Sequence, residues 1–318
     1  MRVELWGVRG SIPAPEGNVE YRLKIREILH RAVTQKISRV EDIEPFLSGV
    51  PENFQYLYGG NTTCASVTSP SGNRYILDCG TGIRTLGDIL MKGAAGKGKA
   101  EIHLFITHTH WDHIQGIPFF KPLYIPGNKI HFHSGISDLH ERLKYQQNAR
   151  FFPKDFDDME ATKIFHSIRA GKDVELEKDF LIDCSPLKHP GGSMAYRFRS
   201  DGKIFVFATD AEFTADYLET FTAEQNDFFT NADLLLIDSQ YTLDEAFKKF
   251  DWGHTSYTMA VNCGLRWKVN KLVLTHHEPA YFDEKLHTIG IDAIQHRNAM
   301  DATLPEIFMA REGMSFDL

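Results

Sequence analysis

The sequence predicts an α/β fold in which layered β-sheets are covered by helices. Short apolar runs rich in β-branched and aromatic residues recur along the chain, as is typical of strands. Amphipathic patterns with helical spacing lie between several of these runs. The runs come first in adjacent groups and later alternate with helices. The chain has 318 residues, 42% of them hydrophobic, and this suffices for one large domain.

Nine apolar runs are predicted to form strands. In chain order they are Val3–Trp6, Ala65–Ser69, Tyr75–Asp78, Ile102–Thr107, Ile130–His133, Met194–Phe198, Ile204–Thr209, Leu234–Asp238 and Leu272–Thr275.

Helices are predicted between these strands. The segment that starts at Thr81 places Ile83, Leu86 and Leu90 on one face, behind Thr81 as N-cap. Asp138–Gln147 is a second helix, and a third begins at Thr255.

Residues 1–318 are interpreted as a single domain with two insertions, at about 16–57 and 141–170. The first contains a basic helical stretch from Tyr21 to Arg31, and the second is rich in Phe and charge with little strand character. Each insertion is either surface decoration with a small satellite core or the wall of a pocket. Either could also form a homodimer interface.

Charge and cysteine content restrict the partners and the compartment. The net charge of −8 disfavours an extended nucleic acid as partner, because proteins that bind phosphates mainly by charge carry a basic surplus. Four widely spaced cysteines without a C-x-x-C motif favour reduced, buried thiols in a cytoplasmic protein. No run approaches the ~20 apolar residues that span a bilayer, so we expect no membrane segment.

The strongest chemical signal is Thr107-His-Thr-His-Trp-Asp-His113, directly after an apolar run. A strand delivers alternate side chains to one face, so His108 and His110 can converge on one point. After a turn, Asp112 and His113 can address a second point. Imidazole and carboxylate are ligands for zinc, iron and manganese.

One such cluster cannot complete two coordination spheres, so further ligands are expected at other strand ends. His189 lies in a turn just before a predicted strand, while Asp210 and His276 each directly follow one. A carboxylate has two oxygens, so Asp210 is the natural candidate for bridging two cations.

The chain resembles the metallo-β-lactamase superfamily in five parts that occur in the same order. These are the Leu77-Asp-Cys-Gly-Thr-Gly turn, Thr107–His113, His189, Asp210 and His276. The resemblance implies a four-layer αββα sandwich with helical insertions and a dinuclear site at one edge of the paired sheets.

The same resemblance implies a ligand set. One metal would be bound by His108, His110 and His189, and the other by Asp112, His113 and His276, with Asp210 bridging. Asp78 matches a position that orders the site rather than binding metal. We expect two divalent ions, zinc first, with manganese or iron as alternatives because His/Asp sites accept all three.

Within the superfamily, the chain resembles most the phosphodiesterase branch that includes tRNase Z and PhnP-like enzymes. The Trp252-Gly-His-Thr-Ser segment is similar to one that places a histidine beside the scissile phosphate in tRNase Z. Drug-hydrolysing members of the best-known zinc class carry Cys where this chain has Asp210, which argues against antibiotic hydrolysis.

His254 is therefore a catalytic candidate, together with Asp112 and Asp78. It precedes a predicted helix whose free backbone N–H groups favour an anion. An imidazole there can donate a proton to the leaving alkoxide. The acid that orients it is either Asp238, in the loop that replaces the His-Glu-Ala-Thr loop of tRNase Z, or absent. Arg9, beside a Gly-rich strand end, is a further residue that could reach the site.

These features predict a two-metal phosphodiesterase that acts on a small phosphodiester, such as a cyclic nucleotide or a cyclic phosphate. No Gly/Pro-rich arm of the kind that grips tRNA is found in the sequence. Two alternatives stay open. One is an ester or thioester hydrolase of the glyoxalase-II type, and the other is a non-catalytic, metal-stabilised sensing protein.

Overall fold

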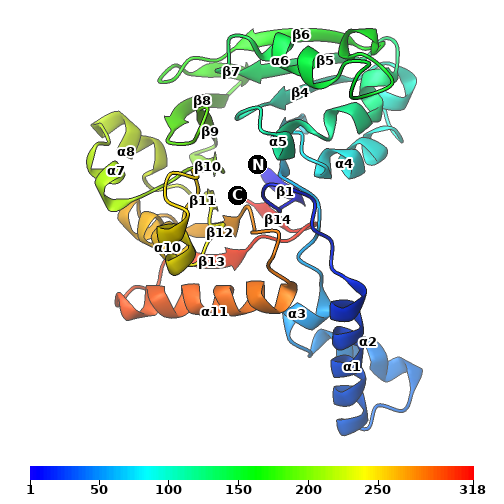
Figure 1. Cartoon of the computed structure of the whole chain (residues 1–318), viewed down its shortest axis with the longest axis vertical. Helices are drawn as coiled ribbons and strands as arrows, with labels where there is room; N and C mark the ends of the chain where they lie inside the picture. Colours follow the sequence, from blue (N-terminus) through cyan, green and yellow to red (C-terminus); the bar gives the residue numbers. More distant parts are fainter.

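Two seven-stranded β-sheets face each other in the computed structural model, which describes residues 1–318 (Figure 1). The strand order is β14-β1-β2-β3-β4-β5-β6 in the first sheet and β13-β12-β11-β10-β9-β8-β7 in the second. Separate apolar clusters attach helices to the outer face of each sheet. The predicted four-layer αββα sandwich is confirmed.

The first sheet combines the two ends of the chain with its first half. Its strands are β14 (Ser315–Asp317), β1 (Arg2–Gly7), β2 (Cys64–Thr68), β3 (Arg74–Leu77), β4 (Glu101–Phe105), β5 (Lys129–Ser134) and β6 (Thr162–Ser167). Strands β3 to β6 run parallel to one another.

The second sheet comes from the second half of the chain. Its strands are β13 (Glu306–Met309), β12 (Lys271–Thr275), β11 (Leu234–Asp238), β10 (Lys203–Ala208), β9 (Ser193–Ser200), β8 (Phe180–Leu187) and β7 (Val174–Glu177). Strands β10 to β13 are parallel, and β7 to β10 are antiparallel.

The helices fall into three groups. Those of the first half are α4 (Gly82–Leu90), α5 (Trp111–Ile114) and α6 (Leu139–Gln146). Those of the second half are α7 (Ala215–Glu219), α8 (Ala223–Phe229), α9 (Leu243–Lys248), α10 (Tyr257–Arg266) and α11 (Asp283–Ala299). The first insertion contains α1 (Asn18–Thr34), α2 (Ile43–Ser48) and α3 (Glu52–Gln55). None of the helices combines the length and the apolar character that crossing a bilayer requires.

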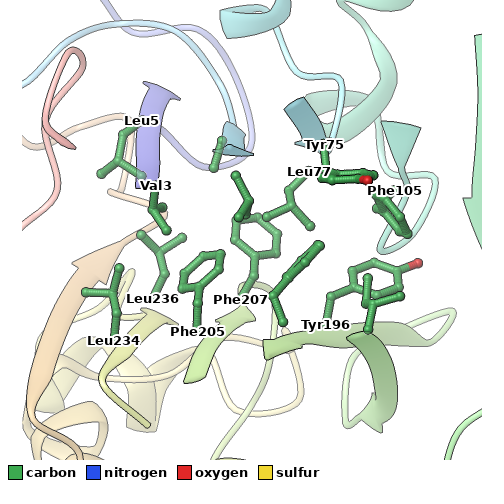
Figure 2. Packing of buried hydrophobic residues seen from close by; sticks show 14 of the residues in the cluster. Val3, Leu5, Tyr75, Leu77, Phe105, Tyr196, Phe205, Phe207, Leu234 and Leu236 are labelled. Atoms are coloured by element: carbon green, nitrogen blue, oxygen red, sulfur yellow. The ribbon is translucent and has the colours of Figure 1, made fainter. Parts of the chain in front are cut away.

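The central core lies between the two sheets (Figure 2). Phe205 and Phe207 of β10 point from the second sheet toward the first, while Val206 and Ala208 belong to the cluster under the outer helices. Both faces of β10 are therefore covered, which explains why its sequence is continuously apolar rather than alternating. This packing fixes where β10 ends, and so where the following Asp210 lies.

The two insertions differ in character. Helix α1 has no buried residue and extends with α2 away from the sheets, at the lower right of Figure 1. The second insertion was expected to have little strand character, but its residues 162–167 form the edge strand β6. Its first part, which includes the end of α6, instead borders a cavity described below.

Five strands were not predicted: β6, β7, β8, β13 and β14. Strands β6, β7, β13 and β14 lie at the edges of the two sheets, and β8 contains Pro186, a residue that argues against a strand. Strand β14 exists only because it pairs with β1 at the other end of the chain. The side chain of Thr81 does not cap α4; it accepts a hydrogen bond from the backbone N–H of Thr62 instead.

Candidate metal centre

The predicted site residues gather at the edge where the carboxyl ends of strands from both sheets meet. His108 follows β4, Asp210 follows β10 and His276 follows β12. In open α/β sheets, ligand sites form at this end because the loops after parallel strands converge there.

Three residues at strand ends have an unusual backbone conformation. Asp78, Asp210 and His276 have φ of 56°, 54° and 63°, the left-handed region that non-glycine residues seldom adopt. Such conformations cost about 1–3 kcal/mol and persist where the surrounding structure imposes them. Here they accompany the sharp change of direction that turns each side chain into the site.

The first group of donors consists of His108, His110, His189 and Asp210, whose ligand atoms all lie within 4.8 Å of one another. His110 Nδ1 is 3.0 Å from His189 Nε2. Asp210 Oδ2 is 3.6 Å from His108 Nε2 and 3.8 Å from His189 Nε2.

The second group consists of Asp112, His113, Asp210 and His276, again within 4.8 Å. Asp210 Oδ1 is 3.0 Å from His113 Nε2 and 3.1 Å from His276 Nε2. Asp112 Oδ2 is 3.1 Å from His276 Nε2. Asp210 thus turns one oxygen toward each group, the arrangement that a bridging carboxylate requires.

The donor set fits divalent metal ions. Nitrogens of neutral imidazoles and carboxylate oxygens suit zinc, manganese and iron. His108 Nε2 is buried without any hydrogen-bond partner, although an unpaired buried polar atom costs about 1–3 kcal/mol. A cation between the donors would remove that cost. The structure brings all seven predicted ligands together, and their role as ligands stays a prediction.

Asp78 lies behind the second group rather than within it. Its Oδ2 is 2.7 Å from His113 Nδ1 and accepts a hydrogen bond from Thr107 Oγ1, while Oδ1 accepts from the Thr107 N–H. Burial raises the pKa of Asp78, an effect that His113 opposes. A carboxylate on the far nitrogen of a ligand histidine fixes the orientation of its ring.

The buried charges of the centre are mutually dependent. Burial opposes the ionisation of Asp210, but His113, His276 and His108 outweigh it and hold the pKa of this carboxyl well below its usual range. Burial also opposes protonation of His113, but Asp210, Asp112 and Asp78 outweigh it and raise its pKa well above the ordinary value.

His254 stands beside the two groups, held by Asp238 at the end of β11. Its Nδ1 is 2.7 Å from Asp238 Oδ2, and its ring stacks on His276 with centroids 4.9 Å apart. Asp238 Oδ1 accepts the backbone N–H of Thr255, just before α10. Asp238 is thus within hydrogen-bond distance of His254, and its role as the orienting acid stays a prediction.

One residue lies elsewhere than expected, and one residue near the site was not predicted. Arg9 does not reach the site: it is buried and donates to the carbonyl oxygens of Gly59 and Tyr281. Glu212 was missed. It binds Lys188 and accepts the N–H of Gly253, whose carbonyl oxygen is 2.8 Å from His189 Nδ1. A second acid two residues after Asp210 is the only local signal for it.

One cavity opens at the donors, and a second adjoins it. The smaller, about 380 Å³, is lined by Ser11, Thr109, His110, Trp111, Asp112, Asp210 and His254. The larger, about 600 Å³, shares Thr109 and Trp111 with it and is also lined by Ile114, Gln115, Glu141, Arg142, Tyr145, Gln146 and Phe151. Part of the second insertion therefore walls a pocket next to the site.

Comparisons with known proteins agree with this architecture. The family model described as "Beta-lactamase superfamily domain" matches residues 73–277. A ribonuclease Z from Prochlorococcus marinus (strain NATL1A) is 24% identical over 274 residues, which cover 68% of this chain and 81% of that protein.

Three solved structures share the fold. YhfI from Bacillus subtilis, a metallo-beta-lactamase fold protein, has a TM-score of 0.63 and 15% identity and covers 99% of this chain and 98% of its own. The human tRNase Z short form has a TM-score of 0.60 and 15% identity, and the match covers 100% of this chain and 99% of that one. A diphosphatase from the PhnP family has a TM-score of 0.58 and 15% identity, with 100% and 97% covered.

Proposed function

The chain belongs to the beta-lactamase superfamily, and on this premise we propose that it is a dinuclear metal-dependent phosphodiesterase that acts on small phosphodiesters. The observation that carries the proposal is the division of seven His and Asp donors into two groups that share Asp210, with His254 beside them. The curated relative named ribonuclease Z and the PhnP-family neighbour support the phosphodiesterase branch.

The residues that would hold the ions follow from the two groups. His108, His110 and His189 would bind one divalent cation, Asp112, His113 and His276 the other, and Asp210 both. Zinc is the expected metal. When bound, such a pair supplies Lewis acidity toward phosphoryl oxygens and lowers the pKa of a bound water.

The chain itself supplies the proton for the leaving group. Because Asp238 holds the Nδ1 side of His254, the Nε2 of this ring is free to face the smaller cavity, which His254 lines. A protonated imidazole in this position gives its proton to the departing alkoxide as the bond to phosphorus breaks. Asp238 would hold the ring in the orientation that this transfer needs.

The larger cavity favours a diester that carries a planar base. Trp111, Tyr145 and Phe151 are well-exposed aromatic side chains around it, and Arg142 reaches across to donate to Thr109 Oγ1. Aromatic side chains bind bases by stacking, which is worth about 1–3 kcal/mol per base. A cyclic nucleotide would place its phosphate at the donors and its base on these rings.

Cleavage of RNA is the second candidate function, because the curated relatives carry the name ribonuclease Z. The net charge of −8 disfavours it, since binding an extended polyanion depends on neutralising many phosphates.

The test combines elemental analysis of the purified protein with a substrate panel. The panel contains bis-p-nitrophenyl phosphate, cyclic nucleotides, cyclic ribose phosphate, a precursor tRNA and S-lactoylglutathione. We expect bound divalent metal and hydrolysis of the small diesters, both lost in Asp112→Ala. Full turnover and full metal content in Asp112→Ala would refute the ligand assignment. Cleavage of the tRNA alone would favour the second candidate, and cleavage of the thioester alone the glyoxalase-type alternative.

Replacement of Trp111 tests the base pocket. Trp111→Ala is expected to raise KM for a cyclic nucleotide about 10-fold, because stacking of that size is lost. KM for cyclic ribose phosphate, which has no base, should not change. Phe119→Ala is the matched control: Phe119 is 54% exposed and does not line the cavity. Equal effects on both substrates would contradict the stacking role.

A further inference from the structure

Four histidines and one glutamate gather on β4, β5 and β6, away from the catalytic edge. Glu101 and His103 are on β4, His131 and His133 on β5, and His166 on β6. The strands are parallel, His103 pairs with His131, and His133 with His166. Alternate residues of a strand share a face, so all five side chains project from the same face of the sheet.

The four imidazoles form a stacked layer with two internal contacts. Ring centroids are 4.6 Å apart for His103 and His131 and 4.5 Å apart for His133 and His166. His103 Nδ1 is 2.9 Å from His133 Nε2, and His131 Nδ1 is 2.8 Å from His166 Nε2. His103 and His131 each use their Nδ1 in these two contacts, which leaves the Nε2 of both rings without a hydrogen bond.

One buried nitrogen of this layer, His131 Nε2, has no hydrogen-bond partner in the protein. His131 is 8% exposed, and its Nε2 is buried without a hydrogen-bond partner although Glu101 Oε1 is 2.9 Å away. Donor atoms of Glu101, His103 and His131 all lie within 4.8 Å of one another. Ligands about 2.1 Å from a tetrahedral zinc ion are about 3.4 Å apart, so a small adjustment would accommodate one.

We propose that Glu101, His103 and His131 form a separate binding site for a divalent cation of the zinc class. Two imidazoles and one carboxylate are a known zinc ligand set that leaves a coordination position open. His133 and His166 would hold the ligand rings by contacting, with their own Nε2, the Nδ1 of His103 and of His131, as partners behind metal-bound histidines do. The bound ion would link β4 to β5 at the end of the sheet opposite the catalytic edge.

The site is open to exchange with solvent. The side chain of Glu101 is 55% exposed, and His103 is half-buried, so an ion can enter without unfolding of the sheet. None of the five residues belongs to the two donor groups of the catalytic edge. Loss of this ion should therefore leave the catalytic ions in place.

The experiment counts zinc ions per chain in the full-length protein. Wild type, His131→Gln and His103→Gln are saturated with Zn²⁺, freed of excess by gel filtration and measured by mass spectrometry of the elements. We expect each variant to carry one zinc ion per chain less than wild type. Both should retain hydrolysis of the substrate that the wild type cleaves. His30→Gln, which removes an exposed histidine of α1, should keep the wild-type count.

Equal zinc counts in wild type and His131→Gln would overturn the proposal. An equal loss in His30→Gln would also overturn it, because the extra ion would then be bound non-specifically by surface histidines. If His131→Gln does not fold, Glu101→Gln at the exposed end of the site decides in the same way.

Discussion

Asp238 performs two tasks with its two oxygens. One oxygen faces Nδ1 of His254 at 2.7 Å, and the other accepts the backbone N–H groups of Thr255 and Gln240. The same carboxylate thus orients the imidazole and holds the chain that carries it. Because the side chain is fully buried, water cannot replace either contact without a cost.

Asp238→Asn removes the negative charge of the side chain while keeping its size and shape. The amide still fills the space, but it removes the negative charge beside His254. We expect kcat to fall about 10- to 100-fold for diesters with poor leaving groups and much less for p-nitrophenolate, which needs no proton. Metal content should not change. Asp244→Asn, on the exposed face of α9, is the control. An equal loss for both kinds of leaving group would show that Asp238 acts only on structure.

At the scale of elements, the loop between α9 and α10 keeps His189 in place. The carbonyl oxygen of Gly253 lies 2.8 Å from His189 Nδ1, and the N–H of Gly253 donates to Glu212. Its φ is +86°, and a Cβ added there would lie 2.3 Å from His189 Nδ1. The loop can approach the histidine this closely only because the residue has no side chain.

Gly253→Ala is therefore expected to displace His189. The variant should lose bound metal, and kcat/KM should fall at least about 10-fold, the range seen when the support of a ligand is removed. Gly202→Ala is the matched control: φ is +72°, but nothing lies within 4 Å of the added Cβ. It should lose only about 1 kcal/mol of stability, from the left-handed backbone. Unchanged metal content in Gly253→Ala would contradict the role of the loop.

At the scale of the whole molecule, the cysteines are distributed over three separate apolar clusters. Cys184 lies between the sheets, Cys64 and Cys79 under the helices of the first sheet, and Cys263 under those of the second. All four are free and buried. Burial raises the pKa of each thiol, that of Cys184 to about 12.

The thiols therefore report on the integrity of all three layers of packing. A raised pKa keeps a thiol protonated at pH 8, and the protonated form is not nucleophilic. We expect no reaction with Ellman's reagent in the folded protein and four reactive thiols per chain in denaturant. Rapid reaction of any thiol in the folded state would show that its cluster opens. Fewer than four after unfolding would indicate a disulfide.

The fold class could be predicted from the sequence because most residues that carry the resemblance to the superfamily are close together in the chain. His108, His110, Asp112 and His113 lie within a stretch of six positions. The strands beneath the site, such as β10 and β11, are buried on both faces, and their sequences are continuous apolar runs. Local composition determines such elements, because what is buried on both sides must be apolar whatever its partners.

Tertiary structure decided everything that depends on which segments become neighbours. The edge strands β6, β7, β13 and β14 have mixed compositions and form because a paired strand offers its free N–H and C=O groups. Arg9 became a buried structural residue, and Asp238 the partner of His254, through contacts between distant parts of the chain. The histidine layer likewise arises only when β4, β5 and β6 align in register. The local sequence determines whether a side chain tends to be buried, but only pairing and register determine which side chains meet.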